Sequence, residues 1–320
     1  MAIPYTKPHL SFCEQVSLLE ERGMIIKNRK GIETLLTNVG YYHMSGYWYP
    51  YRKENPENKQ EKEDAFVDGV AIEEIEKLMF FDKTLRSLTF DMLADIEVAF
   101  RCRIAHEIGK NNAFAYYLGQ CVEKEYQIGG AKNHQYKEWL CKLDSQIDRS
   151  KETFVSHYKS KYNRPFPVWI SCELWDFGMT SKLYEMLARK YRDIIAASLG
   201  IETSSCLRNW LHALNVVRNL CAHNARLWNR SLSTRLQFPS PSNISDLAFM
   251  QIDGYDPTKI AVVLCVIVWL HRKILPKSNA YESLYRHLQS LKSINLPGLN
   301  YNYIGFRSGW ERKNIWNFIK

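Results

Sequence analysis

The segment Ile72–Ile108 constrains the fold more than any other part of the chain. Its apolar residues recur at a helical spacing for about eight turns. These residues are Ile75, Leu78, Met79, Phe81, Leu85, Leu88, Met92, Leu93, Ile96, Ala99, Phe100 and Ile104. We expect one long amphipathic helix here, or two helices with a single break in the middle. A low content of helix breakers, 15 Gly and 11 Pro in 320 residues, also favours a mainly α-helical fold.

The N-terminal part of the chain predicts a small separate module. Apolar spacing indicates short helices within Ser11–Lys27 and Gly31–Val39. Tyr41–Tyr51 is rich in the aromatic residues favoured in strands, so we expect a strand or extended chain there. Helices followed by a strand predict a helix-turn-helix-like or winged module over residues 1–53. The next residues, 54–65, are nearly all polar or charged and predict a solvated charged loop.

A larger helical domain is expected over residues 66–293. Besides the long helix, apolar spacing predicts helices at Glu138–Ser160, Leu174–Tyr191, Ser204–Asn229, Ile260–Lys273 and Tyr281–Lys292. The tail, residues 294–320, is basic and aromatic, and we expect it to pack on this helical body.

Charge is distributed unevenly along the chain. The net charge is +9, yet Met1–Glu202 has a net charge of −1 and Thr203–Lys320 one of +10. A basic region of this kind indicates a nucleic-acid partner. The longest apolar run, Ile260–Leu270, is too short for a membrane helix, and the start of the chain lacks the apolar core of a signal peptide. We therefore expect a soluble cytoplasmic protein.

The cysteines argue against disulfides and a structural metal. Eight cysteines are dispersed along the chain, without a Cys-x-x-Cys pair or a close Cys/His spacing. This distribution is typical of a reduced cytosolic protein. We expect no metal and no cofactor.

One segment, Leu207–Arg230, combines an apolar stripe with a polar face. On a helical projection the stripe contains Leu207, Trp210, Leu211, Leu214, Val217, Cys221 and Trp228. The opposite face contains Arg208, His212, Asn215, Asn219, His223, Arg226 and Arg230. From Thr203 to Ser245 the chain has five Arg and neither Lys nor a carboxylate. A cationic face of this kind favours an anion, and we expect it to contact the phosphates of RNA.

Within this segment Arg218 and His223 form an Arg-x4-His pair. The bare pattern is weak, because Arg101 and His106 repeat it by chance. The longer string RNLCAHNARLWNR is more specific, and Val217–Arg230 resembles the signature of Abi-like proteins of bacterial abortive infection, a branch of the HEPN superfamily of metal-independent ribonucleases. Further parts of the chain resemble that family: Lys7–Tyr51, Phe66–Arg103 and Pro167–Tyr184.

The resemblance implies an HEPN-like helical bundle and an endoribonuclease that acts through Arg218 and His223. The chemistry can also be argued independently. An imidazole titrates near neutrality and can take the 2′-hydroxyl proton or protonate the leaving 5′-oxygen. A guanidinium can stabilise the charge of the pentacoordinate phosphate. DNA lacks the 2′-hydroxyl and should resist cleavage.

The two side chains cannot easily meet on one helix. On an unbroken helix Arg218 and His223 point about 140° apart. Either the helix is distorted between them, or the site combines helices of two protomers across a two-fold axis. HEPN ribonucleases are thought to work in the second way, so we expect a homodimer. Asn219, one turn before His223, is expected to orient the imidazole or the phosphate.

Structural roles compete with these functional ones. Arg218 is alternatively a structural cation paired with Glu97 from another helix, and His223 a surface or capping histidine. Arg101 pairs with Glu97 at a spacing of four residues and is expected to support the site. Trp228 is expected in the core, and the rings of Tyr41–Tyr51 are expected to pack rather than to stack on bases.

Three functions follow. The first is a toxin-like ribonuclease that cleaves RNA during phage infection. The second is an RNA-binding protein of a toxin–antitoxin-like ribonucleoprotein without intrinsic cleavage; the resemblance implies control by a cognate structured small RNA. The third, a DNA-binding regulator acting through the N-terminal module, is weaker because residues 1–202 lack the net positive charge that duplex binding requires.

Overall fold

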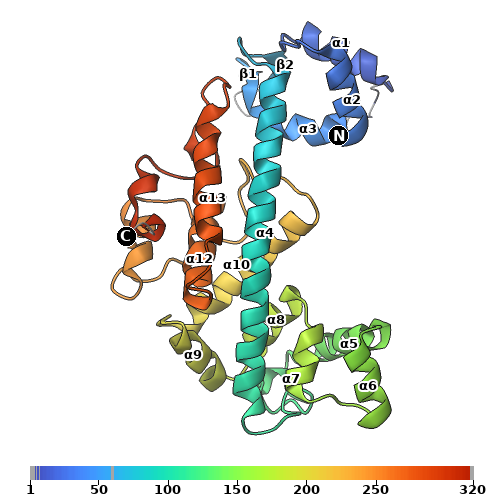
Figure 1. Ribbon diagram of the computed structural model, residues 1–320, viewed down its shortest axis with the longest axis vertical. Coiled ribbons are helices and arrows are strands. Elements are labelled where there is room, and N and C mark those ends of the chain that lie inside the picture. The colour runs from blue at the N-terminus through green and yellow to red at the C-terminus, as the bar shows by residue number, and fades with distance from the viewer. Residues whose placement is uncertain (1–3, 5, 7, 59–60, 318–320) are drawn as a thin grey trace. The chain divides into compact units, whose positions relative to one another are not determined.

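A computed structural model describes residues 4, 6, 8–58 and 61–317 of the chain. The fold is mainly helical, as expected (Figure 1). The chain divides into two compact units. Unit 1 consists of the described residues up to Leu85 together with Arg286–Tyr303, and unit 2 of Arg86–Tyr285 with the described residues from Ile304 onward.

Unit 1 begins with short helices, followed by a hairpin and the first part of a long helix. Its elements are α1 (Phe12–Glu21), α2 (Arg29–Val39), α3 (Tyr41–Trp48), a 3-10 turn (Tyr49–Tyr51), β1 (Arg52–Glu54), β2 (Lys62–Phe66) and the start of α4 (Ile72–Gly109). The end of α13 (Ala280–Gln289) and short 3-10 turns at Ser290–Ser293 and Tyr301–Tyr303 complete it. A capping box between Ser11 and Glu14 starts α1.

The expectation of a strand at 41–51 is wrong, because this segment is helix α3 and a 3-10 turn. Strand preference of aromatic residues depends on their packing rather than on the backbone alone. Here Met44, Tyr47, Trp48 and Tyr51 are buried, and their spacing of three and four residues is that of one helix face. The Tyr47 hydroxyl donates to the buried Asp82 carboxylate at 2.7 Å. The helical spacing was therefore present in the sequence.

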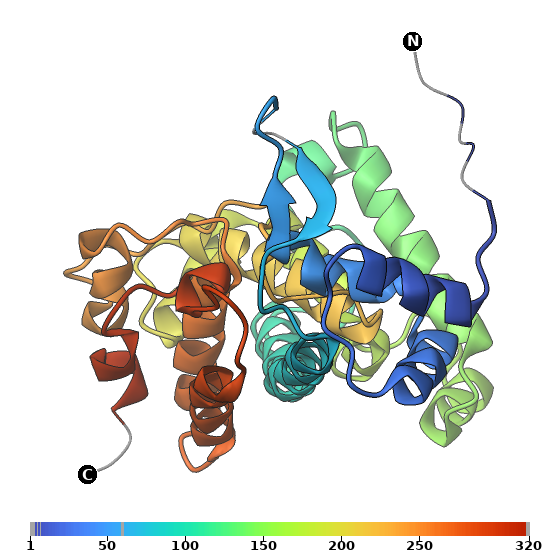
Figure 2. The same cartoon turned by 90° about the horizontal axis from the view of Figure 1, so that it is seen from above.

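The charged segment 54–65 is part of an antiparallel hairpin rather than only a loop. β1 pairs with β2 through Arg52 opposite Phe66 and Glu54 opposite Lys62 (Figure 2). Phe66 is buried, whereas most of the charged residues of both strands remain at least partly exposed. One buried ring anchors the hairpin, so few apolar residues are needed. The division into two compact units falls within α4, after Leu85.

Helix α4 is one unbroken helix of 38 residues, which selects the first of the two expected arrangements. Its first part belongs to unit 1 and the remainder to unit 2. The buried apolar side chains follow the expected spacing throughout.

Unit 2 contains the remaining helices. They are α5 (Asn133–Arg149), α6 (Thr153–Lys161), α7 (Val168–Ser171), α8 (Phe177–Met186), α9 (Arg189–Ser198), α10 (Ser204–Ala222), α11 (Ala248–Ile252) and α12 (Ile260–Ile274). Every residue of α12 from Ile260 to His271 is buried, so α12 forms the centre of this core. In the described part of the chain, we find no helix with both the length and the apolar character needed to cross a membrane.

Two of the expected helices are each divided. The helix expected at 138–160 is α5 and α6, and the one expected at 174–191 is α8 and α9. Leu187 separates the second pair because it lies in extended conformation opposite Val122. The amide of Ala188 donates to the Cys121 carbonyl at 2.8 Å. This pairing with a distant segment could not be recognised from local spacing.

The aromatic residues of the tail lie partly in the core of unit 2. Phe306 stacks on Trp310 with ring centroids 4.6 Å apart, and Trp310 meets Trp316 edge-on at 5.4 Å. All three rings are buried. The guanidinium of Arg272 on α12 donates to the Ile315 carbonyl at 3.0 Å, which holds this segment on the helix.

Candidate RNA-contacting site

Helix α10 forms the scaffold of the site. Its N-cap, Thr203, accepts a hydrogen bond from the Cys206 amide at 3.3 Å. The residues of the expected apolar stripe are buried: Leu207, Trp210, Leu211, Leu214, Val217, Cys221 and Trp228. Trp210 packs edge-on against Trp269 of α12, with ring centroids 5.8 Å apart. Because the stripe is buried, the polar face of α10 is directed toward α4, α8 and solvent.

The helix ends at Ala222, seven residues before the expected end at Asn229. His223 is the C-cap, and Asn224 has a left-handed conformation with φ of 54°. The Asn224 amide donates to the Cys221 carbonyl, and the Ala225 amide to the Leu220 carbonyl. This hydrogen-bond pattern is a Schellman motif, in which Asn is the commonest residue after Gly at the left-handed position. Asn224 was therefore the stop signal that the helical projection missed.

Two expectations change with this helix end. Arg226 and Arg230 do not belong to the polar face of α10; they lie half-buried in the irregular segment after it. Trp228, also beyond the helix, is fully buried and anchors that segment in the core, as expected. The Arg230 guanidinium donates to the Arg226 carbonyl at 3.4 Å.

The helix is not distorted between Arg218 and His223. The His223 amide still donates to the Asn219 carbonyl at 3.0 Å, the helical partner four residues earlier. The two side chains therefore leave α10 in directions about 140° apart. The expectation of a helix distorted between Arg218 and His223 is therefore wrong, and a site shared by two protomers stays a prediction.

Arg218 contacts Glu97 of α4, as the structural alternative predicts. Its Nε lies 3.6 Å from Glu97 Oε2, and the other carboxylate oxygen, Oε1, accepts from Arg101. The Glu97 side chain is only 7% exposed, whereas that of Arg218 is 28% exposed. The Phe90 ring lies 5.9 Å from the Arg218 guanidinium carbon. Glu97 thus orients two arginines, and Arg218 keeps part of its surface in solvent.

A second carboxylate, Asp176, lies within the electrostatic range of Arg218. Asp176 caps α8, where its Oδ1 accepts from the Met179 amide at 2.7 Å, and its Oδ2 pairs with Lys142 at 2.7 Å. Burial alone would raise the pKa of Asp176. The hydrogen bonds from Lys142 and Met179 and the positive charges of Lys142 and Arg218 outweigh burial and hold this pKa below its usual value.

Asp176 was missed in the sequence because 42 positions separate it from Arg218. The signal was the pair Asp176 and Gly178 at a helix start. A Cβ at Gly178 would lie 3.2 Å from Asp176 Oδ1 and 3.6 Å from Asn215 Oδ1. Gly178 thus lies where α8 comes into contact with the polar face of α10.

Three predicted RNA-contacting residues line one groove between α8 and α10. Arg208 and His212 are exposed and Asn215 is half-buried. Together with Lys182 and Glu185 of α8, they line a cavity of about 510 Å³. Figure 1 shows α8 next to α10. Among the described residues that line this groove, Glu185 is the one carboxylate. It pairs with Lys182 at 3.0 Å, so the net charge of this lining is positive.

Arg208 extends this groove toward α9. It also lines two adjacent cavities of about 440 and 370 Å³, both of them shared with Arg192. Arg192 pairs with Glu123 at 3.0 Å. Lys182 and Arg192 were not predicted, because they lie on α8 and α9 and only tertiary packing brings them to the cavities that Arg208 lines.

His223 and Asn219 lie exposed at the end of α10. Asn219 Oδ1 accepts a hydrogen bond from Arg218 Nη1 at 3.4 Å, so within one chain Asn219 contacts the arginine. Within the described residues, no hydrogen bond or ion pair involves the His223 ring. Its imidazole is therefore open to a ligand or a second chain.

The structure thus brings the predicted residues together in two groups. Glu97, Arg101, Arg218 and Asn219 form a connected cluster, and Arg208, His212 and Asn215 share the groove. His223 belongs to neither group. Among the described residues, no group of three or more His, Cys, Asp or Glu side chains is placed to hold a metal ion.

Comparison with known proteins identifies the family. The sequence profile of the Abi-like protein family matches residues 34–229, more than half of the chain. No curated protein and no solved structure matches the chain. The matched range includes α4, α8 and the whole of α10, and it therefore contains the Arg218 cluster, the groove and His223. The chain belongs to the family of Abi-like proteins.

Proposed function

We propose that the chain is a metal-independent endoribonuclease of the HEPN type that acts in bacterial abortive infection. Membership in the Abi-like family indicates a function in abortive infection. The ribonuclease activity is proposed from the chemistry of α10. One observation supports it most strongly. Arg218 is oriented by Glu97 and partly exposed, and five residues later His223 is exposed and has no hydrogen-bond or ion-pair partner among the described residues.

The proposed reaction is attack of a ribose 2′-hydroxyl on the adjacent phosphorus. His223 takes the hydroxyl proton, and a second imidazole or water protonates the leaving 5′-oxygen. Arg218 donates to the non-bridging oxygens as negative charge develops on them. The P–O5′ bond breaks, and the products carry a 2′,3′-cyclic phosphate and a 5′-hydroxyl. In this reaction Glu97 is a positioning residue that holds the Arg218 guanidinium.

We further propose that the active form is a homodimer. Arg218 and His223 diverge on one undistorted helix, so one copy of α10 does not direct both at a single phosphate. A two-fold axis beside the end of α10 would bring the Arg218 of one protomer toward the partner's copy of this helix end. Arg208, His212, Asn215, Arg226 and Arg230 would then hold the RNA on either side of the cut.

The test is cleavage of total RNA by purified protein in the presence of EDTA. We expect cleavage to persist with the chelator and to fall by about 10²- to 10⁴-fold in His223→Ala, because general acid–base catalysis contributes a factor of this size. Products should carry 2′,3′-cyclic phosphates. A substrate with 2′-deoxyribose at the cut position should remain intact.

The chain provides a matched control for this experiment. Arg101 and His106 form a second Arg-x4-His pair, and His106 is also an exposed histidine. His106→Ala should cleave at the parental rate. Equal rates for the parent and His223→Ala, or for His223→Ala and His106→Ala, would exclude His223 as the acid–base group.

A second function, RNA binding without cleavage, is supported by a different observation. Arg218 pairs with the buried carboxylate of Glu97, which is also what a structural cation requires. In this function the basic groove holds a cognate structured small RNA. The measurement is sequencing of RNA that co-purifies with His223→Ala; enrichment of one structured RNA, with no cleavage by the parent, would favour binding over catalysis.

A further inference from the structure

The tyrosine-rich segment of unit 1 has two faces, and only one of them belongs to the core. Tyr47, Trp48 and Tyr51 are buried, while Tyr42 is 76% and Tyr49 48% exposed. Phe12 of α1, 41% exposed, lies at the same rim. Exposed aromatic rings that gather in one place indicate a binding surface, because single exposed rings are scattered on ordinary surfaces.

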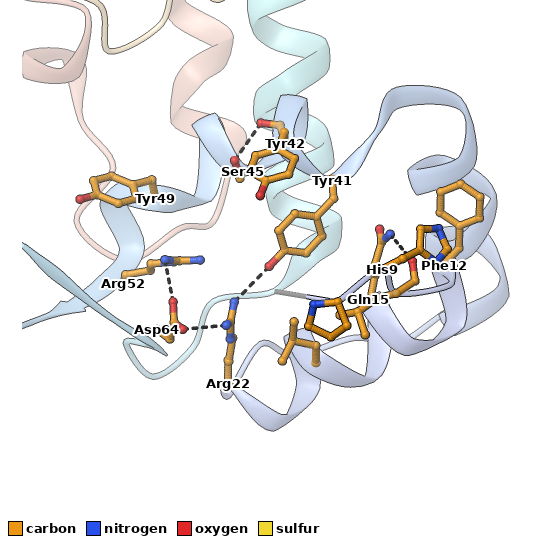
Figure 3. Close-up of a pocket in the computed structure, with 13 residues that line it drawn as sticks. His9, Phe12, Gln15, Arg22, Tyr41, Tyr42, Ser45, Tyr49, Arg52 and Asp64 are labelled. Atoms are coloured by element: carbon orange, nitrogen blue, oxygen red, sulfur yellow. Dashed lines mark hydrogen bonds and ion pairs between the residues drawn. The ribbon is translucent and has the colours of Figure 1, made fainter. Parts of the chain in front are cut away.

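These rings border a cavity of about 510 Å³ within unit 1. Its walls come from α1, α3 and the β1–β2 hairpin (Figure 3). This volume lies in the range typical of small-molecule and cofactor sites, about 300 to 1,000 Å³. The cavity is therefore large enough for one organic ligand.

The charged residues of the cavity form one cluster. Figure 3 shows Arg22 and Arg52 reaching the Asp64 carboxylate from two sides. Arg22 Nη2 lies 2.7 Å from Asp64 Oδ2, and Arg52 Nη1 lies 3.0 Å from Asp64 Oδ1. Arg22 also donates to the Tyr41 hydroxyl at 3.2 Å. These contacts hold two guanidinium groups in place at the wall of the cavity.

The cluster keeps an excess positive charge. Two arginines share a single carboxylate, and among the described residues of the lining there is no other carboxylate and no lysine. The arginine side chains are 18% and 15% exposed, while Asp64 is 56% exposed. A partly buried cation in excess favours an anion, and guanidinium groups match phosphate oxygens in geometry.

We propose that this cavity binds an unpaired nucleotide, with its base stacked on Tyr42 and its phosphate at Arg22 and Arg52. An apolar ligand would leave the positive charge unmatched, and a bare phosphate would leave the exposed rings unused. A nucleotide satisfies both features. Duplex binding needs a strongly basic surface, which unit 1 lacks, whereas one nucleotide in a cavity needs only local charge. This inference deepens the proposed function, because single-stranded RNA contains such nucleotides.

The test measures binding without cleavage, in the full chain with His223→Ala as background. The probe is a fluorescein-labelled oligouridylate of about 12 nucleotides, followed by fluorescence anisotropy. Adding Tyr42→Ala should weaken binding by about 5- to 150-fold, because stacking of one base on an aromatic ring contributes this much. Tyr162→Ala removes a similarly exposed tyrosine from unit 2 and is expected to leave the affinity unchanged.

A second variant tests the charge in the opposite direction. Asp64→Asn removes the one carboxylate among the described lining residues and should tighten binding of the oligonucleotide. Both changed residues are well exposed, so neither variant removes a core contact. If Tyr42→Ala binds like Tyr162→Ala and Asp64→Asn does not tighten binding, the cavity is not a nucleotide site.

Competition by uridine monophosphate distinguishes the source of the nucleotide. Displacement of the oligonucleotide that depends on Tyr42 assigns the cavity to free nucleotides as well. Tyr42-dependent binding without displacement assigns it to a nucleotide within a strand. These measurements do not depend on cleavage, so they test the nucleotide cavity even if the protein does not cleave RNA. If the protein cleaves RNA but Tyr42→Ala does not weaken binding, the nucleotide cavity is refuted and the proposed ribonuclease function is not.

Discussion

Replacement of Glu97 by Gln tests whether the Arg218 cluster is held by a charge. Gln keeps the volume of Glu, so the change removes the charge without leaving a cavity. At 3.6 Å, the distance between Arg218 Nε and Glu97 Oε2, two unit charges attract by about 4 to 5 kcal/mol at an effective dielectric constant of about 20. This is a gross energy, since water solvates the exposed parts of both arginines when the pair is broken.

The net loss in free energy of unfolding depends on how exposed Glu97 and its two arginine partners are. Breaking a fully buried pair costs about 3 to 5 kcal/mol, and an exposed pair contributes about 0 to 1 kcal/mol. The Glu97 side chain is 7% exposed, while those of Arg218 and Arg101 are 28% and 19% exposed. We therefore expect Glu97→Gln to lower the free energy of unfolding by about 2 kcal/mol.

Urea titration followed by tryptophan fluorescence measures this loss. Eight of the nine tryptophans lie in unit 2, and Trp48 lies in unit 1, so the signal reports mainly on the unit that contains the cluster. Glu125→Gln is the matched control, because Glu125 pairs with Lys132 at 3.1 Å and both side chains are 45% exposed. The control should lose much less stability, because solvent screens this exposed pair. Equal losses in the two variants would refute the role of burial in this reasoning.

Three further predictions concern pH, thiols and backbone. Because the pKa of Asp176 is held below its ordinary value of 3.8, its charge stabilises the fold above pH 3.8, and this contribution is lost as pH falls below 3.8. In urea titrations, the free energy of unfolding of Asp176→Asn should therefore be lower than that of the parent at about pH 6 and equal to it in strong acid. Ellman's reagent should label the folded protein only at its exposed cysteines, since the others are buried and desolvation raises the thiol pKa of Cys121 to about 12; full labelling without denaturant would contradict this. The exposed cysteines are Cys13, Cys102 and Cys141. Gly305→Ala should lower the melting temperature more than Gly254→Ala, because at position 305, with φ of 105°, the new Cβ would lie 2.3 Å from Lys259 Cβ, whereas at position 254 nothing lies within 4 Å.

Local patterns predicted most of the helices and the residues of the motif. The spacing in α4 and the stripe of α10 correspond to the side chains that the structure buries. The same spacing existed at 41–51, but aromatic composition was given more weight there than the repeat of Met44, Tyr47, Trp48 and Tyr51. Asn224 likewise indicated the end of α10, whereas the expected helix continued to Asn229 and placed Trp228 on its apolar stripe. These errors came from choosing between signals that the sequence contains.

Local patterns were enough to predict most of the helices, the concentration of positive charge after residue 202, and the divergence of Arg218 and His223. Which side chains lie opposite Arg218 and His223 depends on tertiary packing. A segment without carboxylates receives Glu97 from α4 as the partner of Arg218, and the aromatic segment of unit 1 acquires a pocket with Arg22 and Arg52. Helical periodicity is a property of neighbouring residues. The pairing of charges depends on which distant surfaces pack together, and that is settled by burial of apolar area over the whole unit.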